Sequence, residues 1–205
     1  MNGLRRRKQS GRERRKLLYL VCEGERTEPI YFNNFRTPEC DFRIIILSDH
    51  NNDPIGLVSR AIKVIDDEVF DSEYGDQVWC VFDVDQNSDE KLQAALGMAT
   101  DRGISIALSN PCFEIWYYIH FTFCSSKLSR QDLLVKLDNY IKDYNKTMNV
   151  FECTKDMLPM AIKNAKKLNK MHEGAAVALI GTGSNPSSQV YRVIETINRM
   201  MQHDA

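Results

Sequence analysis

The sequence predicts an α/β fold: a mainly parallel sheet flanked by helices, followed by a helical C-terminal half. Through the first half of the 205 residues, short β-branched and apolar runs alternate with segments of helical periodicity, the pattern of strands joined by crossover helices. Residues 17–22 are apolar nearly throughout, as in a strand buried on both faces of a parallel sheet. From 111 onward the periodicity is almost entirely helical.

Four strands are expected, at 17–22, 42–47, 77–82 and 104–108. The first should be a central strand, because its near-continuous apolar run leaves no polar face for solvent. After these four, the only further candidate is a weak one at 175–180. The rest of the chain should therefore be helical.

Capping residues mark the helices. Thr27 is suited to N-cap a helix that runs to about 36, with Pro29 in its first turn. Ser88 is expected to cap a later helix, and Gly103 to follow its end. The remaining helical patterns lie at 53–69, 88–99, 111–123, 129–144, 154–171 and 186–202.

Charged residues are distributed unevenly along the chain. Positions 4–16 hold eight of the 27 Lys and Arg residues and one acid, whereas the remainder carries 19 basic and 27 acidic residues. A basic arm on an acidic body favours a nucleic-acid partner, because Lys and Arg release counterions from phosphates. A solubilising tail without a ligand explains the charge equally well. We expect a basic arm, a catalytic core and a helical part packed on that core: 1–16, 17–125 and 126–205.

Several classes of protein are excluded by composition. No apolar run approaches the roughly 18 residues that a membrane span needs, and the basic start lacks the apolar segment of a secretory signal. The six cysteines are scattered, without CxxC pairs or zinc-ligand spacing. The sequence therefore predicts a cytoplasmic protein with reduced thiols and no membrane partner.

Acidic residues follow the first and third expected strands. Glu23 comes directly after the first, and Asp83 and Asp85 come after the third. Ligands bind beyond the carboxyl ends of parallel strands, and two residues spaced i, i+2 in extended backbone point to the same face. Three carboxylates without an obvious cationic partner repel one another, which a hard cation such as Mg²⁺ relieves. The pattern predicts a Mg²⁺ site, with Mn²⁺ as an alternative, suited to hydrolysing a phosphodiester.

Two roles stay open for Glu23. A pKa raised by the adjacent aspartates would let it act as a general acid or base, whereas a bound metal that holds it ionised would make it a ligand. Gly24 is expected to allow a tight strand-to-helix turn and to let phosphate approach backbone amides. Glu25 and Glu28 equally suit the first turn of a helix as partners of its dipole.

Four motifs, taken in order, resemble the RloB-like family: Cys22–Glu28 with Tyr31-Phe32, Phe82–Asp85, Ser109–Trp116 with His120-Phe121, and Asn185–Ser188. The resemblance spans about 5–200 and implies a Toprim-like, Rossmann-like fold in which a Glu and a DxD pair bind magnesium. It further implies a prokaryotic protein of anti-phage defence, by abortive infection, beside an ATPase partner of the RloA or OLD type.

The resemblance also implies roles for single residues. Glu23 becomes the catalytic acid or base, and Asp83 and Asp85 become catalytic metal ligands. Sites of the OLD type suggest Glu28 and Glu114 as outer or second-metal ligands. Because no further acid directly follows Asp85, one metal or two remain open.

Substrate contacts are expected from two places: the arm, and the loops around the acids. Asn110 also suits the N-cap of a helix that Pro111 begins. DNA, tRNA and other RNA all fit, and the resemblance slightly favours RNA or tRNA. The chain has no ATP-binding P-loop, so ATP dependence must come from a partner. The expected contacts are Arg5, Arg6, Arg7, Gly24, Arg26 and Asn110.

Two other functions compete with a nuclease. A nucleic-acid-binding or ATPase-regulating subunit would keep the fold without catalysis. A haloacid-dehalogenase-like phosphatase also uses a DxD pair, but on its first strand, with the first Asp as nucleophile. Here the pair follows the third strand, which disfavours a phosphatase. A homo-oligomer is compatible with the sequence.

Overall fold

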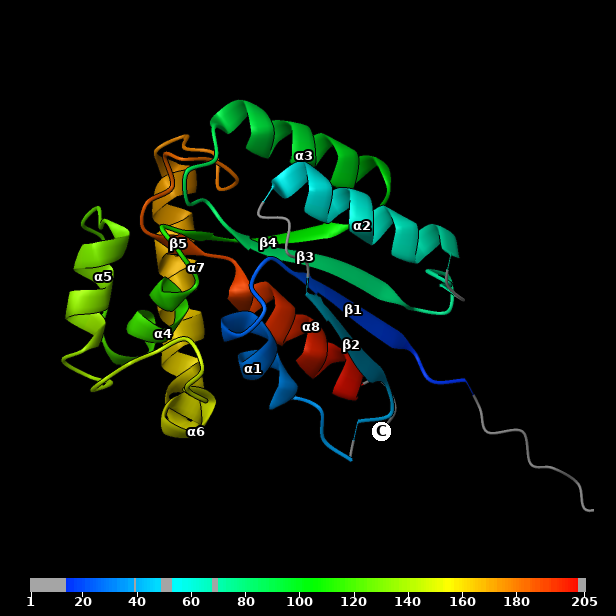
Figure 1. Cartoon of the computed structure of the whole chain (residues 1–205), viewed down its shortest axis with the longest axis horizontal. Coiled ribbons are helices and arrows are strands. Elements are labelled where there is room, and N and C mark those ends of the chain that lie inside the picture. Colours follow the sequence, from blue (N-terminus) through cyan, green and yellow to red (C-terminus); the bar gives the residue numbers. More distant parts are fainter. Residues whose placement is uncertain (1–13, 39, 49–52, 68–69, 203–205) are drawn as a thin grey trace, which may run out of the picture.

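The computed structural model describes residues 14–38, 40–48, 53–67 and 70–202, and has a five-stranded sheet between helices (Figure 1). Four strands are parallel, and the short β5 runs antiparallel to β4. The order across the sheet is β2-β1-β3-β4-β5. The predicted α/β class with a mainly parallel sheet is confirmed. The strands are β1 Leu17–Cys22, β2 Arg43–Ser48, β3 Gln77–Asp83, β4 Ser105–Asn110 and β5 Ser187–Ser188.

Strand β1 lies inside the sheet, as its apolar run predicts. It pairs with β2 on one side and β3 on the other, so that Leu20 lies opposite both Ile46 and Trp79. Alternate residues of β1 enter different hydrophobic clusters, for example Leu20 on one face and Val21 on the other. The strand is buried on both faces.

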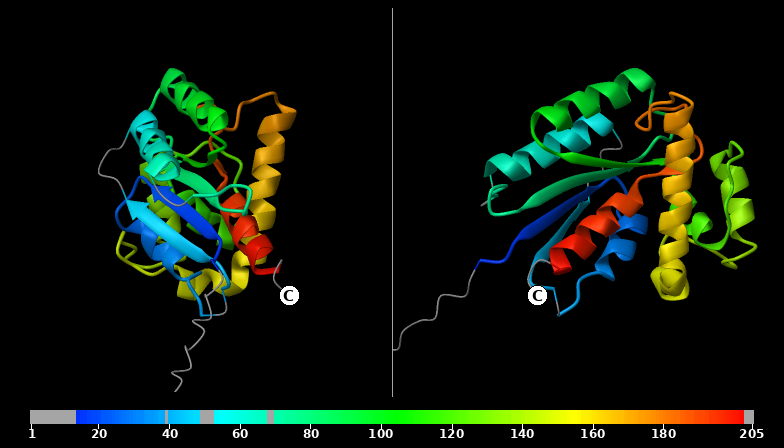
Figure 2. Two further views of the ribbon diagram at one scale, coloured as in Figure 1. Left: turned by 90° about the vertical axis from the view of Figure 1, so that its right-hand side faces the viewer. Right: turned by 180° about the vertical axis from the view of Figure 1, so that it is seen from behind.

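Helices cover the two faces of the sheet in separate layers (Figures 1 and 2). Helices α2 (Pro54–Asp67) and α3 (Asp89–Asp101) pack on one face. Helices α1 (Thr27–Asn33) and α8 (Val190–Gln202) lie on the other. Apolar side chains at helical spacing on these helices fill the space against the strands.

The remaining helices lie beyond the carboxyl ends of the parallel strands (Figure 1). One hydrophobic cluster joins β1 and α1 to α4, α7 and α8, so C-terminal helices pack on the sheet. The boundary between 17–125 and 126–205 stays a prediction. No described helix is long and apolar enough to cross a membrane. These helices are α4 Glu114–Phe121, α5 Arg130–Leu137, α6 Phe151–Thr154, the 3₁₀ turn η1 Lys155–Met157, and α7 Leu158–Gly174.

Two predicted helix starts are wrong for one reason. Asn110 does not cap a helix, because it ends β4 and pairs there with Ser187. Helix α4 begins only at Glu114, and α8 begins at Val190 rather than at 186. The two segments expected to start helices instead pair with each other, and the weak strand candidate at 175–180 is not a strand.

Other helix ends differ by local geometry. Arg26, not Thr27, occupies the N-cap position of α1, whereas Ser88 caps α3 as expected by accepting a hydrogen bond from the Lys91 backbone. Helix α5 ends at Leu137 rather than at 144, and Asp143 beyond it has a positive φ of 56°. A left-handed residue of this kind is incompatible with a continuing α-helix.

The end of the predicted basic arm is attached to the body. The Arg14 guanidinium lies 2.5 Å from the buried Asp76 carboxylate. The second oxygen of that carboxylate accepts the Leu17 backbone N–H at 2.8 Å. Arg5, Arg6 and Arg7 lie outside the described residues, so their expected role as substrate contacts stays a prediction.

Candidate active site

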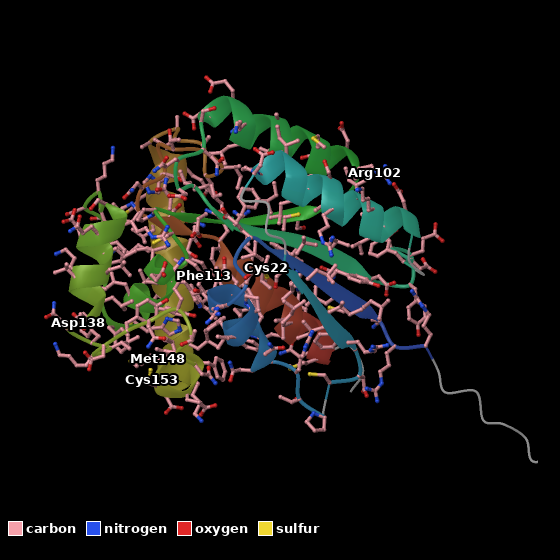
Figure 3. All side chains as sticks on the ribbon, viewed as in Figure 1. Cys22, Arg102, Phe113, Asp138, Met148 and Cys153 are labelled. Carbon is pink, nitrogen blue, oxygen red and sulfur yellow. The ribbon has the colours of Figure 1, made fainter. Side chains whose placement is uncertain are left out.

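A cavity of about 350 Å³ lies beyond the carboxyl ends of β1 and β3. We call it the carboxylate cavity. Figure 3 labels Cys22, the last residue of β1, and Phe113, which lines the cavity. Gly24 and Arg26 also line it, and their role as substrate contacts stays a prediction. Its walls contain all five acids expected to bind metal: Glu23, Glu28, Asp83, Asp85 and Glu114.

Backbone pairing between β1 and β3 continues past the end of β1 and places Glu23 beside Asp83. The Glu23 N–H donates to the Val81 carbonyl at 3.0 Å. The Asp83 N–H in turn donates to Oε2 of the Glu23 carboxylate at 2.8 Å. Two acids 60 residues apart in the sequence are thereby fixed together at one edge of the sheet.

Glu28 folds back from the first turn of α1 onto Gly24. The Gly24 N–H donates to its Oε1 at 3.2 Å. A Cβ at position 24 would lie 2.1 Å from Oε2, so the missing side chain makes room for this carboxylate. The turn from β1 to α1 at Gly24 does not use a left-handed φ. Its amide is occupied by Glu28 in this state.

Asp83 and Asp85 reach the same cavity by a turn rather than by extended backbone. Strand β3 ends at Asp83, and Asp85 has a φ of 40°, a left-handed conformation that Asp tolerates better than most residues. The i, i+2 argument for a shared face is therefore wrong. The environments of the two differ: Oδ1 of Asp83 is buried without a hydrogen-bond partner, whereas Asp85 is exposed.

Glu114 enters the cavity from the first turn of α4 and is 2% exposed. The Tyr144 hydroxyl donates to its Oε1 at 3.1 Å. Tyr144 belongs to the segment after α5, which was predicted to be helical and is not. A hydroxyl from a distant loop thus provides the buried carboxylate with a hydrogen bond.

Burial raises the pKa of three of the acids. It is the largest cause for Glu23, for Glu28, whose pKa rises to about 7, and for Asp83. Repulsion from neighbouring carboxylates adds to each, and for Asp83 it comes from Glu28, Glu23 and Glu114. The expected rise at Glu23 is present, but desolvation exceeds the contribution of Asp85. The site is unfavourable for full ionisation unless cations enter it.

Two such cations, Arg130 and Lys146, line the carboxylate cavity, and sequence reasoning missed both. The Arg130 Nη1 atom lies 3.9 Å from Asp85 Oδ1, and both cations lower the pKa of Glu23 against the effect of burial. The premise that the acids have no cationic partner is therefore wrong. Nothing local marks these residues, because Arg130 follows an ordinary N-cap serine and Lys146 lies in a loop.

Residues 18–197 match the family model described as RloB-like protein. The chain belongs to the RloB-like family. This confirms the resemblance inferred from the four motifs. No curated protein and no solved structure matches the chain.

The four motifs of this RloB-like protein meet in pairs. Glu23 of the first motif is bonded to Asp83 of the second. Ser109 and Asn110 of the third lie opposite Ser188 and Ser187 of the fourth, as the β4–β5 ladder. The first pair forms the acidic wall of the cavity, and the second extends the sheet next to it.

The donors of the RloB-like site suit a hard divalent cation, although they are not yet arranged around one. Within the described ranges, no three His, Cys, Asp or Glu side chains are placed to hold a metal ion together. The donors that are present are carboxylate oxygens, which Mg²⁺ and Mn²⁺ prefer, and Oδ1 of Asp83 is buried without a partner. Binding would require side-chain movement, above all of Glu28 away from the Gly24 amide.

Asn110 lies outside the carboxylate cavity and lines a second cavity next to it. It is 2% exposed, and its amide Nδ2 donates to the carbonyls of Gly181 and Thr182 at 3.3 and 3.2 Å. The side-chain amide of Asn110, which was expected to contact substrate, instead holds the loop after α7. Its observed contacts are those of a residue that positions the wall of a cavity.

Proposed function

We propose that this RloB-like protein is a metal-dependent, Toprim-type nuclease that hydrolyses phosphodiester bonds of nucleic acid. The observation that carries the proposal is the convergence of Glu23, Asp83 and Asp85 at the ends of neighbouring parallel strands, with a buried, unpartnered oxygen on Asp83. Buried carboxylates repel one another, and the pKa values of Glu23 and Asp83 stay raised although Arg130 and Lys146 line the cavity. A catalytic metal site explains why the chain keeps this arrangement.

In this proposal Asp83 and Asp85 hold magnesium or manganese, Glu28 and Glu114 are outer or second-metal ligands, and Glu23 is either a further metal ligand or the general acid or base. When bound, the metal ion would supply positive charge to the oxygens bonded to phosphorus. The Asp83 N–H orients the Glu23 carboxylate through the 2.8 Å hydrogen bond. These residues thus meet the two needs of the reaction, charge neutralisation and orientation.

Glu23 is also suited to proton transfer, since burial raises its pKa towards the range in which a carboxyl group exchanges protons. Water attacks phosphorus, one P–O bond forms and the P–O bond to the leaving nucleoside breaks. Glu23 takes the proton of the attacking water, or delivers one to the leaving oxygen. Either assignment requires the carboxylate to remain beside Asp83.

Arg130 and Lys146 are proposed to bind the phosphate. Arg130 presents a planar guanidinium that matches two phosphate oxygens, and Lys146 adds a point charge. The segment that carries Lys146 is attached to α1 by reciprocal amide hydrogen bonds between Asn34 and Asn149, at 3.0 and 2.9 Å. Both cations thereby come from elements that pack against the acidic wall.

Family membership supports a wider setting for this activity. A cytoplasmic role in anti-phage defence, by abortive infection and with an ATPase partner of the RloA or OLD type, would supply the ATP dependence that the chain lacks the motif to provide. The substrate in that setting is RNA, tRNA or DNA. The alternative, a nucleic-acid-binding or ATPase-regulating subunit, would use the same cavity without cleavage. A haloacid-dehalogenase-like phosphatase lacks support, because the aspartate pair follows β3.

The test uses the purified full chain, alone and with its ATPase partner, on labelled DNA and total tRNA in Mg²⁺, Mn²⁺ or EDTA. We expect metal-dependent cleavage that falls about a thousandfold in Glu23→Gln and in Asp83→Asn. Glu152→Gln, at an exposed position of α6, is the matched control and should cleave like the wild type. Undiminished cleavage in both cavity variants contradicts the proposal. A wild type that binds but never cleaves favours the subunit alternative.

A further inference from the structure

A second cavity, of about 440 Å³, adjoins the carboxylate cavity. Asp85 and Arg130 line both, so the two spaces meet at this pair of side chains. The Arg130 side chain, 39% exposed, is therefore accessible at their junction. We call the second space the adjoining cavity.

The chemistry of the adjoining cavity differs from that of its neighbour. Asp85 is the one acid among its described lining residues, whereas the carboxylate cavity contains several. Lys127 and Arg130 bring two positive charges, and the neutral polar side chains of Ser129 and Asn185 are bonded within the walls. Such walls suit an anionic, polar ligand better than an apolar one or a metal ion.

Hydrogen bonds join the segments that form these walls. The Asn185 side chain accepts the Leu128 N–H and donates to the Leu128 carbonyl, both at 2.9 Å. At Thr182, which also lines the cavity, the backbone N–H donates to Asp89 at 2.6 Å and the carbonyl accepts from Asn110 at 3.2 Å. The adjoining cavity is thus largely preformed, which lowers the ordering cost of binding.

Three cations occur in series through the two cavities. Lys146 lines only the carboxylate cavity, Arg130 lines both, and Lys127 lines only the adjoining cavity. A ligand with a single phosphate would occupy one of these positions. A polynucleotide backbone carries one charge per nucleotide and would use all three.

We infer that the adjoining cavity binds the nucleotide next to the scissile phosphate, with Lys127 on that nucleotide's phosphate. The inference rests on the proposed function and deepens it. The substrate is an extended polynucleotide strand, cleaved within its length, rather than a terminal phosphate or a small phosphodiester. The sugar and base of that nucleotide lie between the preformed walls of the cavity.

The test compares Lys127→Gln with Lys136→Gln, a matched control that changes an exposed lysine of α5 outside both cavities. Each protein is assayed on a labelled ten-nucleotide single strand, as DNA and as RNA, and on bis(p-nitrophenyl) phosphate. For Lys127→Gln we expect the KM for the oligonucleotide to rise about tenfold, with a salt-dependence slope smaller by about 1, since one phosphate contact is lost. Hydrolysis of the small diester should not change, and Lys136→Gln should match the wild type on both.

Each other outcome has a defined meaning. An unchanged KM and salt slope in Lys127→Gln overturns the inference and leaves the nuclease standing. Equal losses on the oligonucleotide and the small diester overturn it too, because they indicate a general effect on the site. If the wild type cleaves neither substrate, alone or with the ATPase partner, the proposed function fails. Oligonucleotide binding, measured by fluorescence anisotropy, then decides: weaker binding and a smaller salt slope in Lys127→Gln support the adjoining cavity as a nucleotide site, whereas equal binding overturns it.

Discussion

Helices α1 and α4 each bury two kinds of side chain, three residues apart. On α1 the carboxylate of Glu28 lines the cavity, while Tyr31 lies in the core. On α4, Glu114 and Tyr117 divide in the same way. Tyr31 packs against six other rings, with centroids 5.5 to 6.3 Å away: Phe32, Phe35, Phe113, Trp116, Tyr117 and Phe151.

The two regions contribute to stability with opposite signs. Buried rings remove apolar surface from water and gain from edge-to-face contacts. Buried carboxylates lose hydration and repel one another, as the raised pKa values of Glu28 and Asp83 indicate. The aromatic cluster therefore stabilises the helices that carry the acids into the cavity. The comparison predicts that changes in the aromatic cluster and changes among the cavity acids will have opposite effects on stability.

The largest effect is expected on the aromatic side. Trp116→Ala removes a fully buried side chain and should lower the free energy of unfolding by about 4 kcal/mol. Urea denaturation, followed by far-UV circular dichroism, measures this loss. Val135→Ala, at a side chain 66% exposed, is the control and should change stability by no more than about 0.5 kcal/mol. A loss below about 1 kcal/mol for Trp116→Ala would contradict the role assigned to the cluster.

His120, on the next turn of α4, extends the comparison to acid pH. It is 1% exposed, its Nε2 has no partner, and burial lowers its pKa to about 4. The unfolded chain binds a proton at His120 at a higher pH than the folded chain does. The free energy of unfolding therefore keeps its full value above about pH 6.5 and falls by about 3 kcal/mol as the pH drops towards 4. His120→Leu should remove this part of the acid dependence in urea titrations at pH 7, 6, 5 and 4. If the free energy of unfolding depends on pH in the same way in the variant and the wild type, His120 does not cause the acid dependence.

On the carboxylate side a substitution should stabilise the protein. The pKa of Asp83 is raised by burial and by neighbouring acids, so its contribution to stability is lost as the pH rises through the folded pKa. In EDTA, Asp83→Asn should gain about 2 kcal/mol at pH 8 and less at pH 5, and thermal melts measure both. Added Mg²⁺ should then raise the melting temperature of the wild type more than that of the variant. A variant less stable than the wild type at pH 8 would contradict the predicted gain in stability.

The smallest effect is expected at Tyr144, which contacts both the aromatic cluster and one of the cavity acids. Tyr144 stacks edge-on against Tyr117 and donates its hydroxyl hydrogen bond to Glu114. Tyr144→Phe keeps the ring and should cost about 1 kcal/mol, because a buried carboxylate loses its donor. A double-mutant cycle with Glu114→Gln isolates the pair. No coupling between the two substitutions would mean that the hydrogen bond is not a stabilising one.

The strands were predictable because their signal is local. The buried run of β1 was placed at its observed bounds, and the other parallel strands were placed within about two residues. Strand β5 was missed because two serines carry no strand propensity, and only pairing with β4 makes Ser187 and Ser188 a strand. The same pairing explains the wrong helix starts at Asn110 and Pro186.

The acids of the site were predictable for the same reason, and the cations were not. Glu23, Asp83 and Asp85 directly follow predicted strands, so topology alone brings them together. Arg130 and Lys146 reach the cavity only through the packing of α5 and the loop after it, which no periodicity encodes. The metal, the nuclease activity and the ATPase partner stay predictions that the cleavage assays test.

Strand β5 has a consequence for the order in which the molecule is completed during synthesis. Ser188 pairs with Ser109, 79 residues earlier in the chain, and Asn110 holds the loop at Gly181 and Thr182. While the ribosome has not yet delivered these late residues, the edge of β4 is open and one wall of the adjoining cavity is missing. The adjoining cavity is therefore completed only after Thr182 and Asn185 have been made, whereas every residue that lines the carboxylate cavity is made earlier in the chain.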